Sequence, residues 1–293
     1  MPRISRLMVL CLIAGAAMSA CKPEEVTLVP ATPTAGIRFI NALPDSAGAL
    51  GLDFRFVDIV ENTTAFRVPF RNAPTTTAGV TAMTAVQYRA AAVGSRHFVI
   101  FLDDTIQAIA STKLKDSTLT LEAGKNYTVI LWGAARAGQM RVRVIDETIA
   151  DPGPGKVALR VINAGDVAIE ASQYVTGGVL PASPTWANVA PYAVSSFVTA
   201  DTGSKSYNVR AAGTTTSLIG ADLTALLGAP ATSSAGAAGK LDIEPIPGTR
   251  VAGSAVTLVV FPRSTAGART PQTAAFQVPA GAFTWDRRPP RGF

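Results

Sequence analysis

A pattern that occurs twice constrains the fold of this 293-residue chain more than any other feature. The segment IRFINA at residues 37–42 returns as LRVINA at residues 159–164. Two further matches keep the same order along the chain, pairing residues 94–101 with 203–209 and residues 124–132 with 253–261. Three collinear matches indicate two copies of one unit. The turn Asp151–Gly155, rich in Pro and Gly, separates them.

Each copy has the pattern of a β-protein. Its apolar runs are short, rich in Val, Ile, Thr, Phe and Tyr, and bounded by Gly, Pro, Asn or Asp. In the first copy the predicted strands are 37–42, 52–60, 80–90, 97–102, 106–112, 118–121, 126–132 and 140–146. Many short strands at such spacing favour two sheets that bury their apolar faces against each other. We therefore expect an all-β fold of two tandem antiparallel Ig-like or transthyretin-like β-sandwich domains.

The segments between the predicted strands also allow predictions. Asp103–Thr105 and Glu122–Asn126 are predicted hairpin turns, the second because Gly124 tolerates a positive φ. Only Ala221–Leu227 has a helical pattern. The low-complexity segment Ala229–Gly239 predicts a mobile loop.

The N-terminus has the pattern of an export signal. Arg3 and Arg6 precede a 12-residue apolar run at 7–18, which is too short to span a bilayer. Ser19 and Ala20 then lead directly into Cys21. This segment resembles the bacterial lipobox, with Met18 where Leu is commonest. An ordinary signal peptide followed by an incidental cysteine is the alternative.

The lipobox resemblance implies a lipidated N-terminus. Cys21 would be diacylated, the peptide cut before it and the new amine acylated, and three buried chains anchor a protein almost permanently. Cys11 would leave with the signal, so the mature chain would hold no disulfide and would rely on its core. Lys22, rather than Asp, favours the outer membrane over retention in the inner one.

These observations divide the chain into five parts. The expected parts are a signal peptide at 1–20, the lipidated Cys21 with a flexible tether at 21–36, a first β-sandwich domain at 37–150, a second at 157–284 and a disordered basic tail at 285–293.

Two stretches of the first copy resemble a known family. Residues 38–45 resemble the opening R-V-x-N-A-S-P-D, and residues 119–129 the later strand L-x-A-G-x-x-Y-T-V, of domain-of-unknown-function family 4397. The second copy keeps the opening but has Gly165-Asp166 in place of Pro-Asp and Val256 in place of the Tyr. The resemblance implies exported or surface-anchored tandem β-domains and assigns no catalytic residue.

Composition excludes several kinds of site. A single histidine, His97, excludes a multi-histidine metal site, and no G-x-S-x-G motif accompanies it. The net charge is +6, but the basic residues are dispersed, which argues against nucleic acid as a partner. We expect no metal, no cofactor and no catalytic residue.

The remaining candidates each have a structural alternative, which we favour. Asp103 and Asp104 could form a carboxylate pair or stabilise a turn. Asp45, Asp53 and Asp58 could supply oxygen ligands to calcium, although their spacing fits no EF-hand. Asn41 and Asn163 recur at one position of the pattern, which suits a side chain that caps backbone groups. Five aromatic residues could form a sugar-binding platform or pack in cores: Tyr88, Tyr127, Trp132, Trp186 and Tyr192.

The sequence therefore predicts a lipid-anchored protein of the bacterial cell envelope that is not an enzyme. It would contact the membrane through its acyl chains, in the outer membrane, and bind, adhere to or scaffold an envelope protein or polysaccharide. The alternatives are an envelope glycan-binding module and a glycan hydrolase that works through carboxylates.

Overall fold

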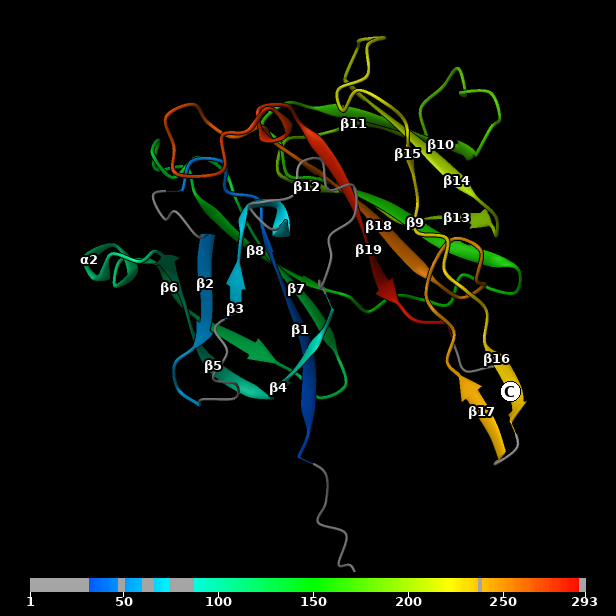
Figure 1. The fold of residues 1–293 in the computed structure, drawn as a ribbon, viewed down its shortest axis with the longest axis horizontal. Coiled ribbons are helices and arrows are strands. Elements are labelled where there is room, and N and C mark those ends of the chain that lie inside the picture. The colour runs from blue at the N-terminus through cyan, green and yellow to red at the C-terminus, as the bar shows by residue number, and fades with distance from the viewer. Residues whose placement is uncertain (1–31, 47–50, 60–65, 74–86, 237–238, 290–293) are drawn as a thin grey trace, which may run out of the picture. The chain divides into compact units, whose positions relative to one another are not determined.

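A first β-sandwich is formed by strands β1 to β8 (Figure 1). The computed structural model describes residues 32–46, 51–59, 66–73, 87–236 and 239–289. The inner sheet of this sandwich has the order β4 (Arg89–Ala92), β1 (Thr34–Asn41), β7 (Asn126–Trp132), β8 (Arg141–Asp146). The outer sheet has the order β3 (Phe66–Val68), β2 (Gly51–Phe56), β5 (Gly94–Asp103), β6 (Lys113–Leu121).

Alternation along the strands builds the first core. Ile37 and Phe39 of β1 point toward the outer sheet and are buried with Leu131 of β7. Phe39 stacks on Phe98 of β5 with ring centroids 5.7 Å apart, and aromatic contacts of this kind add to the hydrophobic stabilisation.

A second sandwich follows β8. Its inner sheet contains β12 (Ala193–Val194), β9 (Lys156–Asn163), β18 (Ala255–Phe261) and β19 (Ala280–Arg287), and β13 (Val198–Asp201) also pairs with β9. Its outer sheet has the order β11 (Trp186–Val189), β10 (Ile169–Val175), β14 (Lys205–Ala211), β15 (Leu223–Thr224). Tyr207 lies at the centre of the core, stacked on Trp186 and edge-on to Phe283. The all-β sandwich fold is confirmed.

One strand pair in each inner sheet is parallel, although the other pairs are antiparallel. In the first sandwich β1 and β7 run parallel with Arg38 beside Thr128. In the second, β9 and β18 run parallel with Arg160 beside Thr257. The same residue types therefore meet at the same place in both inner sheets.

The two inner sheets pack against each other through their second faces. Ile40 and Ile130 of the first sandwich and Ile162 and Val259 of the second are fully buried in one apolar cluster. The four central strands are therefore buried on both sides, and Pro33–Phe293 forms one compact unit. This explains why their sequences are nearly continuous apolar runs.

A long connection between β18 and β19, residues 262–279, adds a second junction; we call it the strap. Arg71 lies in the short 3₁₀ turn η1 (Phe70–Asn72) of the first sandwich and donates hydrogen bonds to four strap carbonyls. Phe276, in the strap's own 3₁₀ turn η2 (Ala274–Phe276), packs against Phe70. Burial lowers the pKa of Arg71 to about 10, so this cation is still charged at neutral pH.

The helix prediction was wrong. Ala221–Leu227 contains the short strand β15, which pairs with β14. The described α-helix is instead α2 (Gln107–Ala110), inside the range 106–112 that was predicted to be a strand. A single turn of helix is too short to leave a period in the sequence.

Each predicted hairpin turn differs in part from the structure. Asp103–Thr105 begins the connection between the antiparallel neighbours β5 and β6, but that connection is longer than predicted and contains α2. Gly124 has the expected positive φ of 74°, but its turn leads from the outer sheet at β6 to the inner sheet at β7. Turn residues indicate that the chain reverses, and they do not say which sheet the next strand joins.

Three boundary predictions also change. β1 begins at Thr34, so the end of the predicted tether at 21–36 is a strand. Thr232–Gly236 (β16) and Gly239–Ile243 (β17) pair as a two-stranded sheet, where a mobile loop was predicted. β19 extends to Arg287, so residues 285–287 of the predicted tail at 285–293 are ordered. The predicted signal peptide and Cys21 lie outside the described residues.

Candidate functional site

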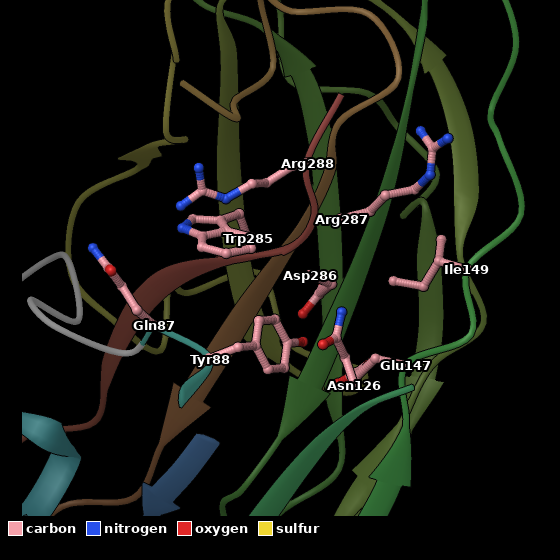
Figure 2. Close-up of a pocket in the computed structure, with 9 residues that line it drawn as sticks. All are labelled: Gln87, Tyr88, Asn126, Glu147, Ile149, Trp285, Asp286, Arg287 and Arg288. Carbon is pink, nitrogen blue, oxygen red and sulfur yellow. The ribbon is translucent and has the colours of Figure 1, made fainter. Parts of the chain in front are cut away.

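A cavity of about 440 Å³ opens where the inner sheets of the two sandwiches meet (Figure 2). Its lining comes from the ends of four segments: Gln87 and Tyr88 before β4, Asn126 at the start of β7, Glu147 and Ile149 after β8, and residues 285–288 at the end of β19. Both sandwiches therefore contribute to it. Its volume lies in the range of small-molecule sites, roughly 300–1,000 Å³.

The wall of the cavity combines aromatic rings with polar groups. The rings of Tyr88 and Trp285 meet edge-to-face with centroids 5.5 Å apart. The Arg288 guanidinium lies 4.8 Å from the centroid of Trp285 and forms an ion pair with Glu244 at 3.6 Å. Arg287 pairs with Asp151 at 3.0 Å, so both cations at the rim have carboxylate partners.

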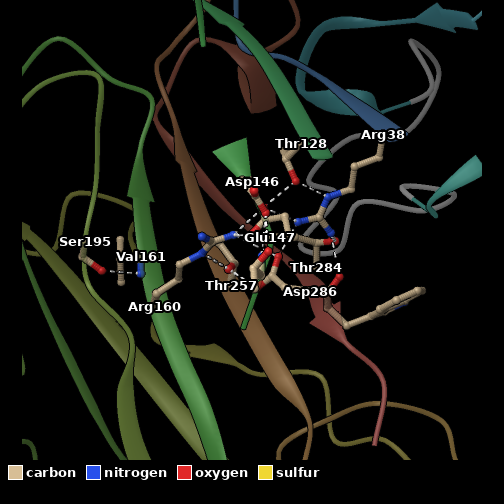
Figure 3. Close-up of polar contacts among 12 residues, drawn as sticks. Arg38, Thr128, Asp146, Glu147, Arg160, Val161, Ser195, Thr257, Thr284 and Asp286 are labelled. Atoms are coloured by element: carbon tan, nitrogen blue, oxygen red, sulfur yellow. Dashed lines mark hydrogen bonds and ion pairs between the residues drawn. The ribbon is translucent and has the colours of Figure 1, made fainter. Parts of the chain in front are cut away.

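Beneath the cavity lies a buried network of two arginines and two carboxylates (Figure 3). In the first sandwich, Nε of Arg38 donates to Oγ1 of Thr128 at 2.8 Å, and that hydroxyl donates to Glu147 at 2.6 Å. In the second, Nε of Arg160 donates to Oγ1 of Thr257 at 2.7 Å, and Thr257 donates to Asp286.

Two of the four ion pairs in this network cross between the sandwiches. Arg38 contacts Asp286 of the second sandwich, and Arg160 donates to both oxygens of Glu147, each at 2.7 Å. The four charged side chains are at most 4% exposed. Because a buried charge is costly unless it is paired and hydrogen-bonded, this crossing ties each sandwich to the other.

An aromatic ring covers each arginine. Cζ of Arg38 lies 4.6 Å from the centroid of Tyr88, and Cζ of Arg160 lies 4.5 Å from that of Phe197. Burial opposes the charge of Arg38, yet Tyr88 and the two carboxylates hold its pKa above the ordinary value. Burial also raises the pKa of Tyr88, with a contribution from the carboxylates, so this phenol stays neutral at physiological pH.

Residues 35–170 match the family described as Domain of unknown function (DUF4397). The chain contains a DUF4397-like domain. The match covers the whole first sandwich and continues through the 151–155 turn into β9 and the first residues of β10. No curated protein matches the chain.

Within the DUF4397-like domain, His97 lies on the exposed side of β5. Its Nε2 atom is 2.7 Å from Asp116, and both side chains are about half exposed. Asp103 and Asp104 have different partners, Arg67 and Arg269. Asp104 also accepts a hydrogen bond from the amide of Ile106, as the side chain of a turn residue does.

The three aspartates considered for calcium are also engaged separately. Asp45 accepts hydrogen bonds from the amides of Ala135 and Arg136, and Asp53 pairs with Arg55. Partial burial opposes the charge of Asp58, but hydrogen bonds from Arg96 and the His97 amide hold its pKa well below the usual range. Across the described part of the chain, no three His, Cys, Asp or Glu side chains are grouped as metal ligands.

The two recurring asparagines cap backbone groups, as predicted. Asn41 accepts from the amide of Leu43 and donates to the carbonyl of Val68. Asn163 accepts from the amide of Gly165 and donates to three carbonyls, including that of Val189. Both side chains are fully buried, which leaves them no access to a ligand.

The five aromatic candidates do not form one platform. Tyr127, Trp132 and Trp186 are buried in apolar clusters, and Tyr192 packs on Trp132. Only Tyr88 lines the cavity, where its partner is Trp285. Trp285, Glu147 and Asp286 carry no signal of a site in the sequence, because Trp285 and Asp286 begin the predicted basic tail and Glu147 follows a strand without any motif.

Glu147 and Asp286 are the two carboxylate residues among those that line the cavity. Both contact the same nitrogen of Arg160, and both accept from a threonine hydroxyl. Their side chains are fully buried beneath the cavity. Each of the two carboxylates contacts both arginines.

Proposed function

We propose that this protein is a lipid-anchored, non-catalytic binding protein of the bacterial cell envelope, whose two sandwiches act as one rigid body. The observation that carries the proposal is the crossed buried network, which joins the sandwiches and occupies both carboxylates at the cavity. A body joined in this way holds its loops and its cavity in a fixed geometry, which reduces the entropy lost on binding.

The anchor rests on the sequence around Cys21. Three acyl chains there would hold the protein in one leaflet, with the outer membrane favoured by Lys22. No helix among the described residues has the length and apolarity to cross a bilayer. Replacing Cys21 by Ser should move the full chain from the membrane fraction to the soluble fraction. A variant that still sediments with membranes would contradict lipidation.

The two sandwiches are proposed to be copies of one unit. Two observations support this: the parallel strand pairs have the same register, and each copy contributes an arginine, a threonine and a carboxylate in the same relation. Two equivalent surfaces that pack on each other through exchanged ion pairs form a closed, isologous contact.

The rival proposal is a glycan hydrolase, which the position of Glu147 and Asp286 at an aromatic-lined cavity favours. Incubating the full chain with purified envelope polysaccharide separates the two. Binding without release of reducing ends supports the binding role. Release of reducing ends that disappears in Glu147→Gln, but persists in the exposed-surface variant Glu122→Gln, would replace it with hydrolysis.

A further inference from the structure

We infer that the cavity between the sandwiches is a binding site for a neutral sugar residue of a glycan. This inference rests on the proposed binding role and names its ligand class. Arg38 and Arg160 neutralise Glu147 and Asp286 beneath the cavity, and the rim cations are paired with Asp151 and Glu244. A charged ligand would have to displace one of these partners, and a neutral one would not.

The hydrogen-bonding groups left for a ligand are neutral. The hydroxyl of Tyr88 is buried and lies beside Thr128, so the groups that face a ligand are side-chain amides. The half-buried amide of Asn126 contributes to the lining, together with the exposed amide of Gln87. The two amides can both donate and accept hydrogen bonds, which is what the hydroxyl groups of a sugar require.

The aromatic pair supplies the apolar part of the site. Tyr88 and Trp285 stand at the cavity wall, on the side opposite Asn126 and Ile149 (Figure 2). Trp285 is only half-buried, unlike Trp132 and Trp186 in their clusters. The C–H face of a sugar ring can pack against such rings while its hydroxyl groups reach the amides.

The backbone beside Asn126 leaves room for its side-chain amide. Gly36 of β1 lies next to Asn126 in register, and a Cβ at Gly36 would stand 2.1 Å from Oδ1 of Asn126 and 3.3 Å from Cβ of Tyr88. Any other residue there would push both side chains from their positions. In the second sandwich, Arg160 corresponds to Arg38, and the ring that covers it is Phe197, which carries no hydroxyl.

The test is a fluorescence titration of the full chain in a detergent without sugar groups. The chain has three tryptophans, and only Trp285 lines the cavity. The probes are neutral trisaccharides of glucose and of N-acetylglucosamine, with trigalacturonate as the acidic comparison. At least one neutral trisaccharide should shift the emission, and Trp285→Phe should abolish that shift.

Two variants decide whether the trisaccharide binds in the cavity. Asn126→Ala removes an amide of the lining and should weaken binding about fivefold, the usual effect of one lost hydrogen bond. Gly36→Ala should also weaken it, and Tyr174→Phe, which removes an exposed hydroxyl bonded to Asp222, should leave it unchanged.

Three results would overturn the inference: no emission shift with any neutral trisaccharide, a shift with trigalacturonate alone, or equal binding by Asn126→Ala and the wild type. None of these results would bear on the proposed lipid anchor, because release of the Cys21→Ser variant from membranes is measured separately. A protein that is membrane-anchored yet binds no sugar would retain the binding role with a ligand of another class.

Discussion

Four buried charged residues hold the junction of the two sandwiches: Arg38, Glu147, Arg160 and Asp286. Each arginine also bonds to a threonine of its own sandwich, so the charges are both paired and hydrogen-bonded. A pair of this kind adds little stability relative to apolar residues of the same volume, but the loss of one member leaves the other unpaired in a low-dielectric interior.

Asp286→Ala should therefore lower the free energy of unfolding by about 3–5 kcal/mol, the usual result of breaking a buried pair. Asp201→Ala is the matched control, because Asp201 forms an exposed ion pair with Lys156. Urea denaturation of both variants checks the prediction. Equal shifts in the two variants would mean that the network contributes no more than a surface pair.

Asp58 makes stability depend on pH in the acid range. Hydrogen bonds from Arg96 and the His97 amide hold its pKa below the unfolded value of about 3.9, against the effect of partial burial. A depressed carboxyl pKa contributes stability that is complete above the unfolded pKa and is lost as the pH falls toward the folded one.

We expect the urea midpoint of Asp58→Asn to lie below that of the wild type at pH 6, and the difference to shrink below about pH 4. Asp166→Asn, at an exposed aspartate, should show no such convergence. A difference between Asp58→Asn and the wild type that stays constant from pH 6 to pH 2 would contradict the account.

At the scale of elements, the strap joins the second sandwich to the first through one side chain. Arg71 has backbone φ of 61° and donates to the carbonyls of Pro262, Ala275, Phe276 and Val278. No carboxylate partner for Arg71 occurs in the part of the chain that the structure describes. The strap's position therefore depends on bonds from one cation to several carbonyl groups.

Arg71→Ala should speed amide hydrogen exchange in residues 262–279 and lower the free energy of unfolding by about 2–3 kcal/mol, because the carbonyls lose a charged donor. Arg263→Ala, an exposed arginine of the same strap, is the control. Unchanged exchange in Arg71→Ala would show that Phe276 alone holds the strap.

The sequence predicted elements well where the pattern is local. Residues 126–132 form β7 with the predicted bounds, because Tyr, Val, Ile and Trp follow one another between turn residues. Asn41 and Asn163 could be assigned as capping residues because they recur at the end of the same motif. Ala221–Leu227 failed because its composition favours a helix while pairing with β14 decides its structure.

The candidate site could not be predicted from local sequence patterns. Arg38 and Asp286 are 248 positions apart, and no local pattern indicates that they meet. The basic composition of the last residues favoured a free tail, whereas the buried Asp286 beside Trp285 places that segment in a strand. Tertiary contacts between distant segments determined the site, and the repeated motif indicated only where its two arginines lie.

At the scale of the whole molecule, the central claim is that the two sandwiches are one body. Their inner sheets bury a common apolar cluster, exchange ion pairs and share the strap. Separating them would expose the apolar faces of four central strands, so neither sandwich should unfold while the other stays intact.

Hydrogen-exchange mass spectrometry of the full chain across a urea series tests this claim most directly. Peptides from β5 of the first sandwich and from β14 of the second report on the two outer sheets, which do not form the junction. The account predicts that both lose protection at the same urea concentration, and that the double variant Glu147→Ala, Asp286→Ala separates the two transitions. Two separate transitions in the wild-type protein would contradict it.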